Sequence, residues 1–219
     1  MTRDWHDWYA NYDDPTSSLS RRLEVVRERL RLALADSTAH PDRELTLVSM
    51  CAGDGRDTLP VLAATPRRIR AVLVELDERL GARARETAAG LRLDRVEVRT
   101  ADAGRTDAYA GAVPADVLLA CGVFGNVTDV DIERTIAALP TLLSPGATVI
   151  WTRGRRAYAD DPSDAAGDRS EDVRRLFARA GFEEIAFVRP EDAGFRVGVH
   201  RFAGPAEPYA PGRTLFAFV

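Results

Sequence analysis

The chain has 219 residues, with 30 basic and 34 acidic side chains and a formal charge of −4. Every basic residue other than histidine is arginine, which excludes a Schiff-base lysine, a lysine general base and a phosphate-loop lysine. The near-balanced charge gives no electrostatic support for a nucleic acid or an anionic membrane as partner. No apolar run approaches the roughly 18 residues that a membrane span needs.

Length and composition predict a soluble protein with an N-terminal aromatic and helical arm over residues 1–40 and a main domain over residues 41–219. The two cysteines, Cys51 and Cys121, lie far apart in apolar runs, and no signal peptide is recognised. We therefore expect the reduced cytoplasm as the compartment. The bias towards Ala, Arg, Asp and Gly is typical of a GC-rich bacterial genome. The scattered histidines and cysteines give no metal-ligand spacing, so we expect no metal.

The N-terminal stretch is rich in aromatic residues, among them Trp5, Trp8, Tyr9 and Tyr12. Two interpretations stay open: the aromatic side chains anchor the arm on the main domain, or they form a lid that contacts substrate and excludes water. An amphipathic helix follows, because apolar residues recur at three- and four-residue steps from Leu19 to Leu34.

From residue 45 onward, short apolar runs alternate with helical patterns. Strands are predicted at Leu45–Met50, Ile69–Glu75, Val96–Thr100, Ala115–Cys121, Ala147–Thr152, Phe182–Val188 and Thr214–Val219. Helices are predicted at Thr58–Ala64, Glu78–Ala89, Asp129–Leu143 and from Ser170 to Gly181. This alternation predicts a doubly wound α/β fold, with a largely parallel sheet and helices on both faces. The segment from Pro190 to Arg213 has no clear pattern.

The residues that indicate a ligand site follow the first three predicted strands. The first strand enters the small-residue turn Cys51–Gly55, where Gly53 and Gly55 allow the backbone to approach a ligand closely. About twenty residues later, Glu75 ends the second strand. A carboxylate at this place can accept hydrogen bonds from both hydroxyls of an adenosine ribose. Asp102 follows the third strand, in position to meet an adenine amino group. Ligands of open parallel sheets bind at these carboxyl ends.

With this turn, these two acids and the fourth strand, the sequence from Leu45 to Val219 resembles the class I S-adenosylmethionine-dependent methyltransferases. The resemblance implies a seven-stranded sheet with one antiparallel strand, the last two predicted strands forming a reversed hairpin. It also implies S-adenosylmethionine as cofactor and methyl transfer by in-line displacement. The implied cofactor contacts are Tyr12, Cys51, Ala52, Gly53, Asp54, Gly55, Glu75, Leu76, Asp102, Ala103, Cys121 and Gly122.

The turn departs from the family pattern at two positions. Cys51 stands where the family has its first glycine, and Ser49 stands where an acid often precedes it. Asp54 is a candidate replacement for the acid that would pair with the methionyl amine. A dinucleotide-binding fingerprint needs a third glycine where Thr58 stands, which disfavours a nicotinamide cofactor.

Candidates for the reaction itself are fewer. His200 is the best general base by residue type, although a single histidine in a strand-like run is more often structural. Asn126 either hydrogen-bonds substrate or caps the helix that begins near Asp129. Arg153 follows the fifth strand and either clamps an acidic substrate or belongs to a solvated loop. A nucleophilic role for Cys121 is disfavoured, since no cation is expected beside it.

These observations predict a methyltransferase that acts on a small molecule rather than on nucleic acid. Two alternatives remain: a non-catalytic sensor or partner subunit that binds S-adenosylmethionine, and an NAD-dependent oxidoreductase. The methyl acceptor and the oligomeric state cannot be deduced from these patterns.

Overall fold

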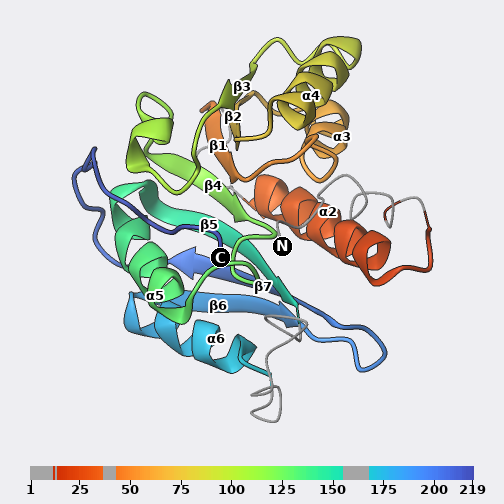
Figure 1. The fold of residues 1–219 in the computed structure, drawn as a ribbon. Helices are drawn as coiled ribbons and strands as arrows, with labels where there is room; N and C mark the ends of the chain where they lie inside the picture. The colour runs from red at the N-terminus through yellow and green to blue at the C-terminus, as the bar shows by residue number, and fades with distance from the viewer. Residues whose placement is uncertain (1–11, 13, 37–42, 155–167) are drawn as a thin grey trace.

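A computed structural model describes residues 12, 14–36, 43–154 and 168–219. Its strands are β1 (Leu45–Met50), β2 (Ile69–Glu75), β3 (Val96–Thr100), β4 (Ala115–Ala120), β5 (Leu143–Gly154), β6 (Phe182–Val188) and β7 (Phe195–Phe202). Its α-helices are α2 (Ser18–Asp36), α3 (Leu59–Ala64), α4 (Glu78–Gly90), α5 (Asp129–Ala138) and α6 (Ser170–Arg179). The predicted α/β class with an N-terminal helix is confirmed (Figure 1).

The seven strands form one sheet in the order β3-β2-β1-β4-β5-β7-β6. Strand β7 runs antiparallel to both β5 and β6, while the pairs from β3 across to β5 are parallel. The order reverses between β1 and β4, and a ligand crevice is expected at the carboxyl ends of such a pair. Topology therefore directs attention to the turn after β1 and the loop after β4.

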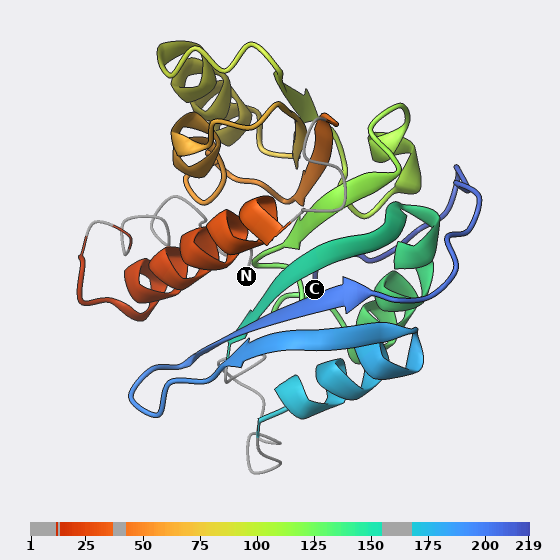
Figure 2. The same cartoon turned by 180° about the vertical axis from the view of Figure 1, so that it is seen from behind.

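Two apolar cores lie on opposite faces of the sheet. Helices α2, α3 and α4 pack on one face, and α5 and α6 pack on the other (Figures 1 and 2). Val26, Leu30 and Leu34 of α2 are buried in the first core, as the amphipathic pattern predicts. The central strands β1 and β4 are buried almost throughout, which explains their unbroken apolar sequences.

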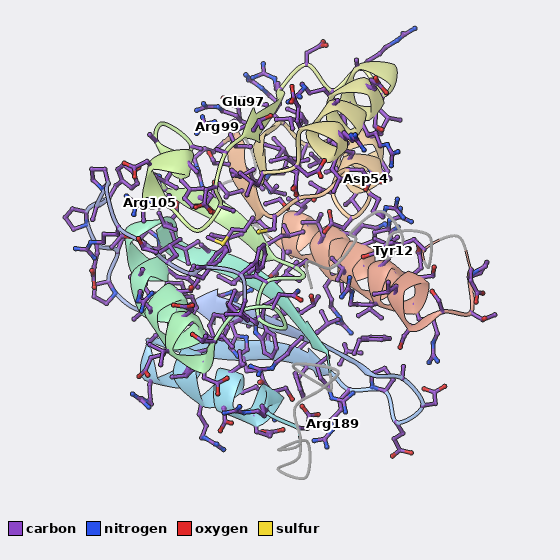
Figure 3. The ribbon with its side chains drawn as sticks, viewed as in Figure 1. Tyr12, Asp54, Glu97, Arg99, Arg105 and Arg189 are labelled. Atoms are coloured by element: carbon purple, nitrogen blue, oxygen red, sulfur yellow. The ribbon has the colours of Figure 1, made fainter. Side chains whose placement is uncertain are left out.

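The edge strand β3 is charged. Glu97 and Arg99 form an ion pair with a Nε–Oε1 distance of 2.7 Å along this strand (Figure 3). Charged side chains on an edge strand oppose pairing with a further strand of another molecule. Within the described parts of the chain, no helix is long and apolar enough to cross a membrane.

The predicted last strand is wrong. The strand that pairs with β6 is Phe195–Phe202, and Thr214–Val219 makes only isolated bridges within the described structure. The sequence pattern does not predict strand β7, because this strand contains a charged and a polar residue whose buried partners lie far away in the sequence. Arg196 pairs with Asp168, and His200 accepts a hydrogen bond from Trp151.

The helix predicted at Asp129–Leu143 is shorter than expected. It ends at Ala138, and Pro140 lies in the 3-10 turn Leu139–Thr141 that follows. Strand β5 begins earlier than predicted, at Leu143, with Gly146 at a φ of +79° before the main run of the strand. Both differences come from proline and glycine positions that redirect the chain locally.

Replacing Gly198 of β7 by alanine should destabilise the fold. An added Cβ would lie 2.2 Å from Cε2 of Trp151, a fully buried side chain. Overpacking of this kind costs about 1–3 kcal/mol. Urea denaturation should show that loss for Gly198→Ala and no loss for Gly90→Ala, since a Cβ at Gly90 meets nothing within 4 Å. Equal stabilities for the two variants would contradict this packing.

Candidate functional site

The turn after β1 requires unusual backbone conformations. Cys51, Gly53 and Gly55 have φ values of +49°, +58° and +73°. A Cβ on Gly55 would lie 2.6 Å from Cδ1 of Leu59, so glycine is needed there for space as well as for conformation. Cys51 adopts the left-handed region without being glycine, and such a residue costs of order 1 kcal/mol. The turn thus keeps the predicted shape despite its departure from the family pattern.

Glu75 links this turn to the end of β2. Its Oε2 accepts a hydrogen bond from the backbone N–H of Gly53 at 2.7 Å, and its Oε1 accepts from the N–H of Asp77 at 2.8 Å. The side chain is 8% exposed. Burial raises the pKa of the Glu75 carboxyl, while the backbone donors oppose that rise. A carboxylate offers about four acceptor positions, so at least one remains for a ligand hydroxyl.

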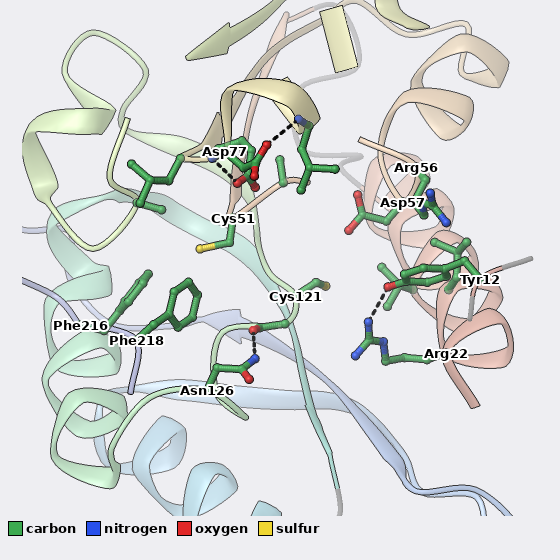
Figure 4. Close-up of a pocket in the computed structure, with 18 of the residues that line it drawn as sticks. Tyr12, Arg22, Cys51, Arg56, Asp57, Asp77, Cys121, Asn126, Phe216 and Phe218 are labelled. Carbon is green, nitrogen blue, oxygen red and sulfur yellow. Dashed lines mark hydrogen bonds between the residues drawn. The ribbon is translucent and has the colours of Figure 1, made fainter. Parts of the chain in front are cut away.

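A cavity of about 370 Å³ lies at the carboxyl ends of the strands (Figure 4). This volume falls in the range of small-molecule sites. It is lined by Tyr12, Arg22, Leu23, Val26, Cys51, Ala52, Arg56, Asp57, Glu75, Leu76, Asp77, Leu80, Asp102, Ala103, Cys121, Gly122, Asn126, Phe216 and Phe218. Most of the predicted contacts therefore meet in one place.

One side of the cavity is ionic and comes partly from α2. Arg22 donates from Nη2 to the Tyr12 hydroxyl at 2.6 Å, and the Arg56 guanidinium lies 4.4 Å from the centre of the Tyr12 ring. Asp57 accepts from the Thr58 hydroxyl at 2.9 Å. Burial raises the pKa of Asp57, and the Arg22 charge opposes that rise. A cation, an anion and a phenol therefore line the same end (Figure 4).

The opposite side is aromatic. Phe216 and Phe218 lie side by side there, with ring centroids 5.7 Å apart (Figure 4). Asp102 lines this cavity too, with its Oδ1 accepting from the N–H of Gly104 at 2.8 Å. That hydrogen bond is the local turn that such an acid often makes, and it is compatible with a further contact from the carboxylate.

Both cysteines line the cavity as predicted. Burial raises the pKa of the Cys51 thiol, and the nearby Glu75 and Asp102 carboxylates raise it further. Burial also raises the pKa of the Cys121 thiol. Both side chains are therefore neutral thiols at physiological pH, which opposes a nucleophilic role.

Asn126 lines the cavity and does not cap α5. Its Nδ2 donates to the carbonyl oxygen of Gly122 at 2.7 Å. The cap of α5 is Thr128, whose hydroxyl accepts from the N–H of Asp131. The capping alternative for Asn126 is wrong. Asp77 caps α4 by accepting hydrogen bonds from the N–H groups of Arg79 and Leu80.

His200 lies away from the cavity. It is 1% exposed, accepts from Nε1 of Trp151 at 3.1 Å and stacks on Phe177 with centroids 4.4 Å apart. Burial lowers the pKa of His200 to about 4, against the opposing charge of Glu184. This placement argues against the predicted general base and matches the structural alternative.

Four further candidates do not line the cavity. Gly53 and Gly55 shape the turn behind it, and Asp54 pairs with Arg56, the distance from Oδ1 to Nε being 2.9 Å. Arg153 is 3% exposed and pairs with Asp129 at 3.4 Å, so it belongs neither to the cavity nor to a solvated loop. Trp5, Trp8 and Tyr9 lie outside the described residues, and their predicted lid role stays a prediction.

Several lining residues are not predicted as site residues from the sequence. The pattern places Arg22, Leu23 and Val26 in an amphipathic helix, and Phe216 and Phe218 in a strand of the sheet. A signal existed for the helix, since Arg22 and Val26 are four residues apart and share one face. Within the described residues, no group of histidine, cysteine and acidic side chains could hold a metal ion.

The sequence matches no protein-family model and no curated protein. Solved structures are similar in fold. Magnesium protoporphyrin IX methyltransferase ChlM from Synechocystis PCC 6803, with bound S-adenosylmethionine, has 14% identity and a TM-score of 0.62 over 91% of each chain. The N-methyltransferase NodS from Bradyrhizobium japonicum has 17% identity and a TM-score of 0.61 over 88% of this chain and 99% of its own.

A third similar structure is the cyclase SpnF, with 18% identity and a TM-score of 0.55 over 83% of this chain and 81% of its own. These likenesses show that the chain has the methyltransferase type of α/β fold. They do not by themselves fix its reaction, since one fold serves several chemistries.

His200 should make stability depend on pH. Its pKa is about 4 in the folded chain, against an ordinary 6.5. As the pH falls, His200 therefore takes up a proton in the unfolded chain before it does so in the folded chain. The free energy of unfolding should fall by up to about 3 kcal/mol as the pH drops from about 6.5 to about 4. Urea denaturation across this range should show a smaller fall for His200→Gln, which keeps an acceptor for Trp151. The same pH dependence in both proteins would rule out this assignment.

Proposed function

We propose that the chain is an S-adenosylmethionine-dependent methyltransferase that acts on a small molecule. The observation that carries this proposal is the Glu75 carboxylate, which Gly53 and Asp77 fix in the wall of a cavity with one ionic and one aromatic side. Support comes from the fold shared with the methyltransferases ChlM and NodS.

The two ends of the cavity match the two ends of this cofactor. At the ionic end, the Arg22 guanidinium would bind the methionyl carboxylate, and Asp57 would bind the ammonium group. The raised pKa of Asp57 reflects a desolvated carboxylate, and a bound cation would offset that desolvation. Asp57 replaces Asp54 in this role, because Asp54 is held by Arg56 outside the cavity. Glu75 would accept hydrogen bonds from the ribose hydroxyls, and Asp102 would accept one from the adenine amino group.

The bound sulfonium would supply an activated methyl group for in-line displacement. The chain itself would contribute mainly orientation and exclusion of water, since aligning two reactants supplies much of the rate enhancement. Asn126 would orient the acceptor, and Cys121 and Gly122 would form the floor beside the transferred methyl. With His200 in the core, we propose no general base. A carboxamide accepts a hydrogen bond but does not take up a proton at neutral pH.

The small-molecule assignment rests on charge and on the shape of the site. The net charge of −4 gives no electrostatic support for a nucleic acid as substrate. The cavity is partly covered by α2 through Arg22, Leu23 and Val26, which narrows access to the carboxyl ends of the strands. A compact acceptor fits such a covered site better than a polymer does.

Glu75→Ala should remove binding of S-adenosylhomocysteine. The substitution deletes the ribose acceptor and also leaves the N–H groups of Gly53 and Asp77 without their partner, so both site and turn are lost. Calorimetric titration should show saturable binding by the wild type, with no comparable binding of NAD, and none by Glu75→Ala. Glu78→Ala, an exposed acid outside the cavity, is the matched control. Binding of NAD instead would favour the oxidoreductase alternative.

Arg22→Ala should weaken S-adenosylhomocysteine selectively. A charge-assisted hydrogen bond contributes about 1.5–3 kcal/mol, which corresponds to a loss of roughly tenfold to a hundredfold. Adenosine lacks the carboxylate, so its affinity should not change. Arg31→Ala is the control, because Arg31 pairs with Glu28 on the outer face of the same helix. An equal loss for both ligands would show that Arg22 does not bind the amino-acid end.

A further inference from the structure

The segment Thr214–Val219, which follows β7 along the chain, crosses the carboxyl ends of the strands instead of joining the sheet. The N–H of Leu215 donates to the carbonyl of Gly104 in the loop after β3, at 2.7 Å. The N–H of Val219 donates to the carbonyl of Asn126 in the loop after β4, at 3.2 Å. The segment therefore connects two loops that each supply residues to the cavity lining, Asp102 and Ala103 after β3 and Asn126 after β4.

This segment is anchored in the core. Leu215 is fully buried, and its carbonyl accepts from the hydroxyl of Thr135 on α5 at 3.1 Å. A Cβ on Gly104 would lie 2.2 Å from the carbonyl oxygen of Phe216, so the two backbones touch. Arg105 donates from Nη1 to the Thr214 hydroxyl at 2.6 Å. These contacts fix the backbone of the segment, and with it the positions from which Phe216 and Phe218 extend.

Phe216 and Phe218, which alternate with Leu215 and Ala217 along the segment, both line the cavity. Phe216 is 3% exposed and packs against the Phe218 ring, whereas the Phe218 side chain is 46% exposed. Asp102 lies on the loop that the segment contacts, and its carboxylate lines the same cavity. An aromatic face beside a carboxylate suits a planar heterocycle that stacks and donates from an exocyclic amine.

We propose that Phe218, supported by Phe216, forms the aromatic wall on which the adenine ring stacks. The inference rests on the proposed function and deepens it. It assigns a binding role to a segment outside the sheet, and it fixes the direction of the ligand. The nucleoside occupies the Phe218 end, and the amino acid extends towards Arg22, on the opposite side of the cavity (Figure 4).

Phe218→Ala tests this directly. Loss of base stacking should weaken binding of S-adenosylhomocysteine roughly tenfold, and of adenosine by the same factor, because both carry the adenine ring. Phe218→Trp keeps an aromatic face and should retain affinity close to that of the wild type. Calorimetric titration gives the affinities. The thermal midpoint without ligand should hardly change in either variant, since the Phe218 ring is half exposed.

Val219→Ala is the matched control, because Val219 is 70% exposed, does not line the cavity and keeps its backbone hydrogen bond. Equal affinity of the wild type and Phe218→Ala for both ligands would overturn this inference and leave the proposed function standing. Failure of the wild type to bind either ligand would overturn the proposed function and this inference together.

Discussion

The hydrogen bond from the Gly53 backbone to the Glu75 carboxylate is the interaction on which the site depends. It holds the turn after β1 against the end of β2, and the same carboxylate fixes the N–H of Asp77, the residue that caps α4. One buried acid thereby joins the turn after β1, the end of β2 and the residue that caps α4. Its desolvation raises its pKa, and the backbone donors compensate part of that cost.

Around this acid, distant parts of the chain contribute different chemistry. Helix α2 supplies the Arg22 cation, the residues just after the turn supply the half-buried Asp57 carboxylate, and the segment after β7 supplies Phe218. The result is a cavity with opposite character at its two ends. Such asymmetry selects an extended ligand with a charged end and a planar end, and it aligns that ligand in one direction only. Binding geometry and methyl delivery would both follow from this alignment.

The sequence predicted the parallel core well, because the buried strands have unbroken apolar runs and their turns carry glycine. The turn at Gly53 and Gly55, with Glu75 at the expected distance, was visible for the same reason. Strand β7 was not, since the burial of Arg196 depends on Asp168, which is distant in sequence. The role of Phe218 depends on how its segment packs, which its local sequence does not indicate. Arg22 shares a helix face with Val26, but only the packing of α2 on the sheet shows that this face borders the cavity. His200 is a candidate base by residue type alone, and its position in the core favours the structural alternative that the sequence also left open.

The fold alone does not settle the reaction, as the likeness to both methyltransferases and a cyclase illustrates. The central claim concerns the ligand and its direction in the cavity. A crystal structure of the protein with S-adenosylhomocysteine tests it most directly. The account predicts ribose hydroxyls on Glu75, adenine against Phe218 and the amino-acid end beside Arg22. A ligand bound in the reverse direction, or absent from this cavity at saturating concentration, would contradict it.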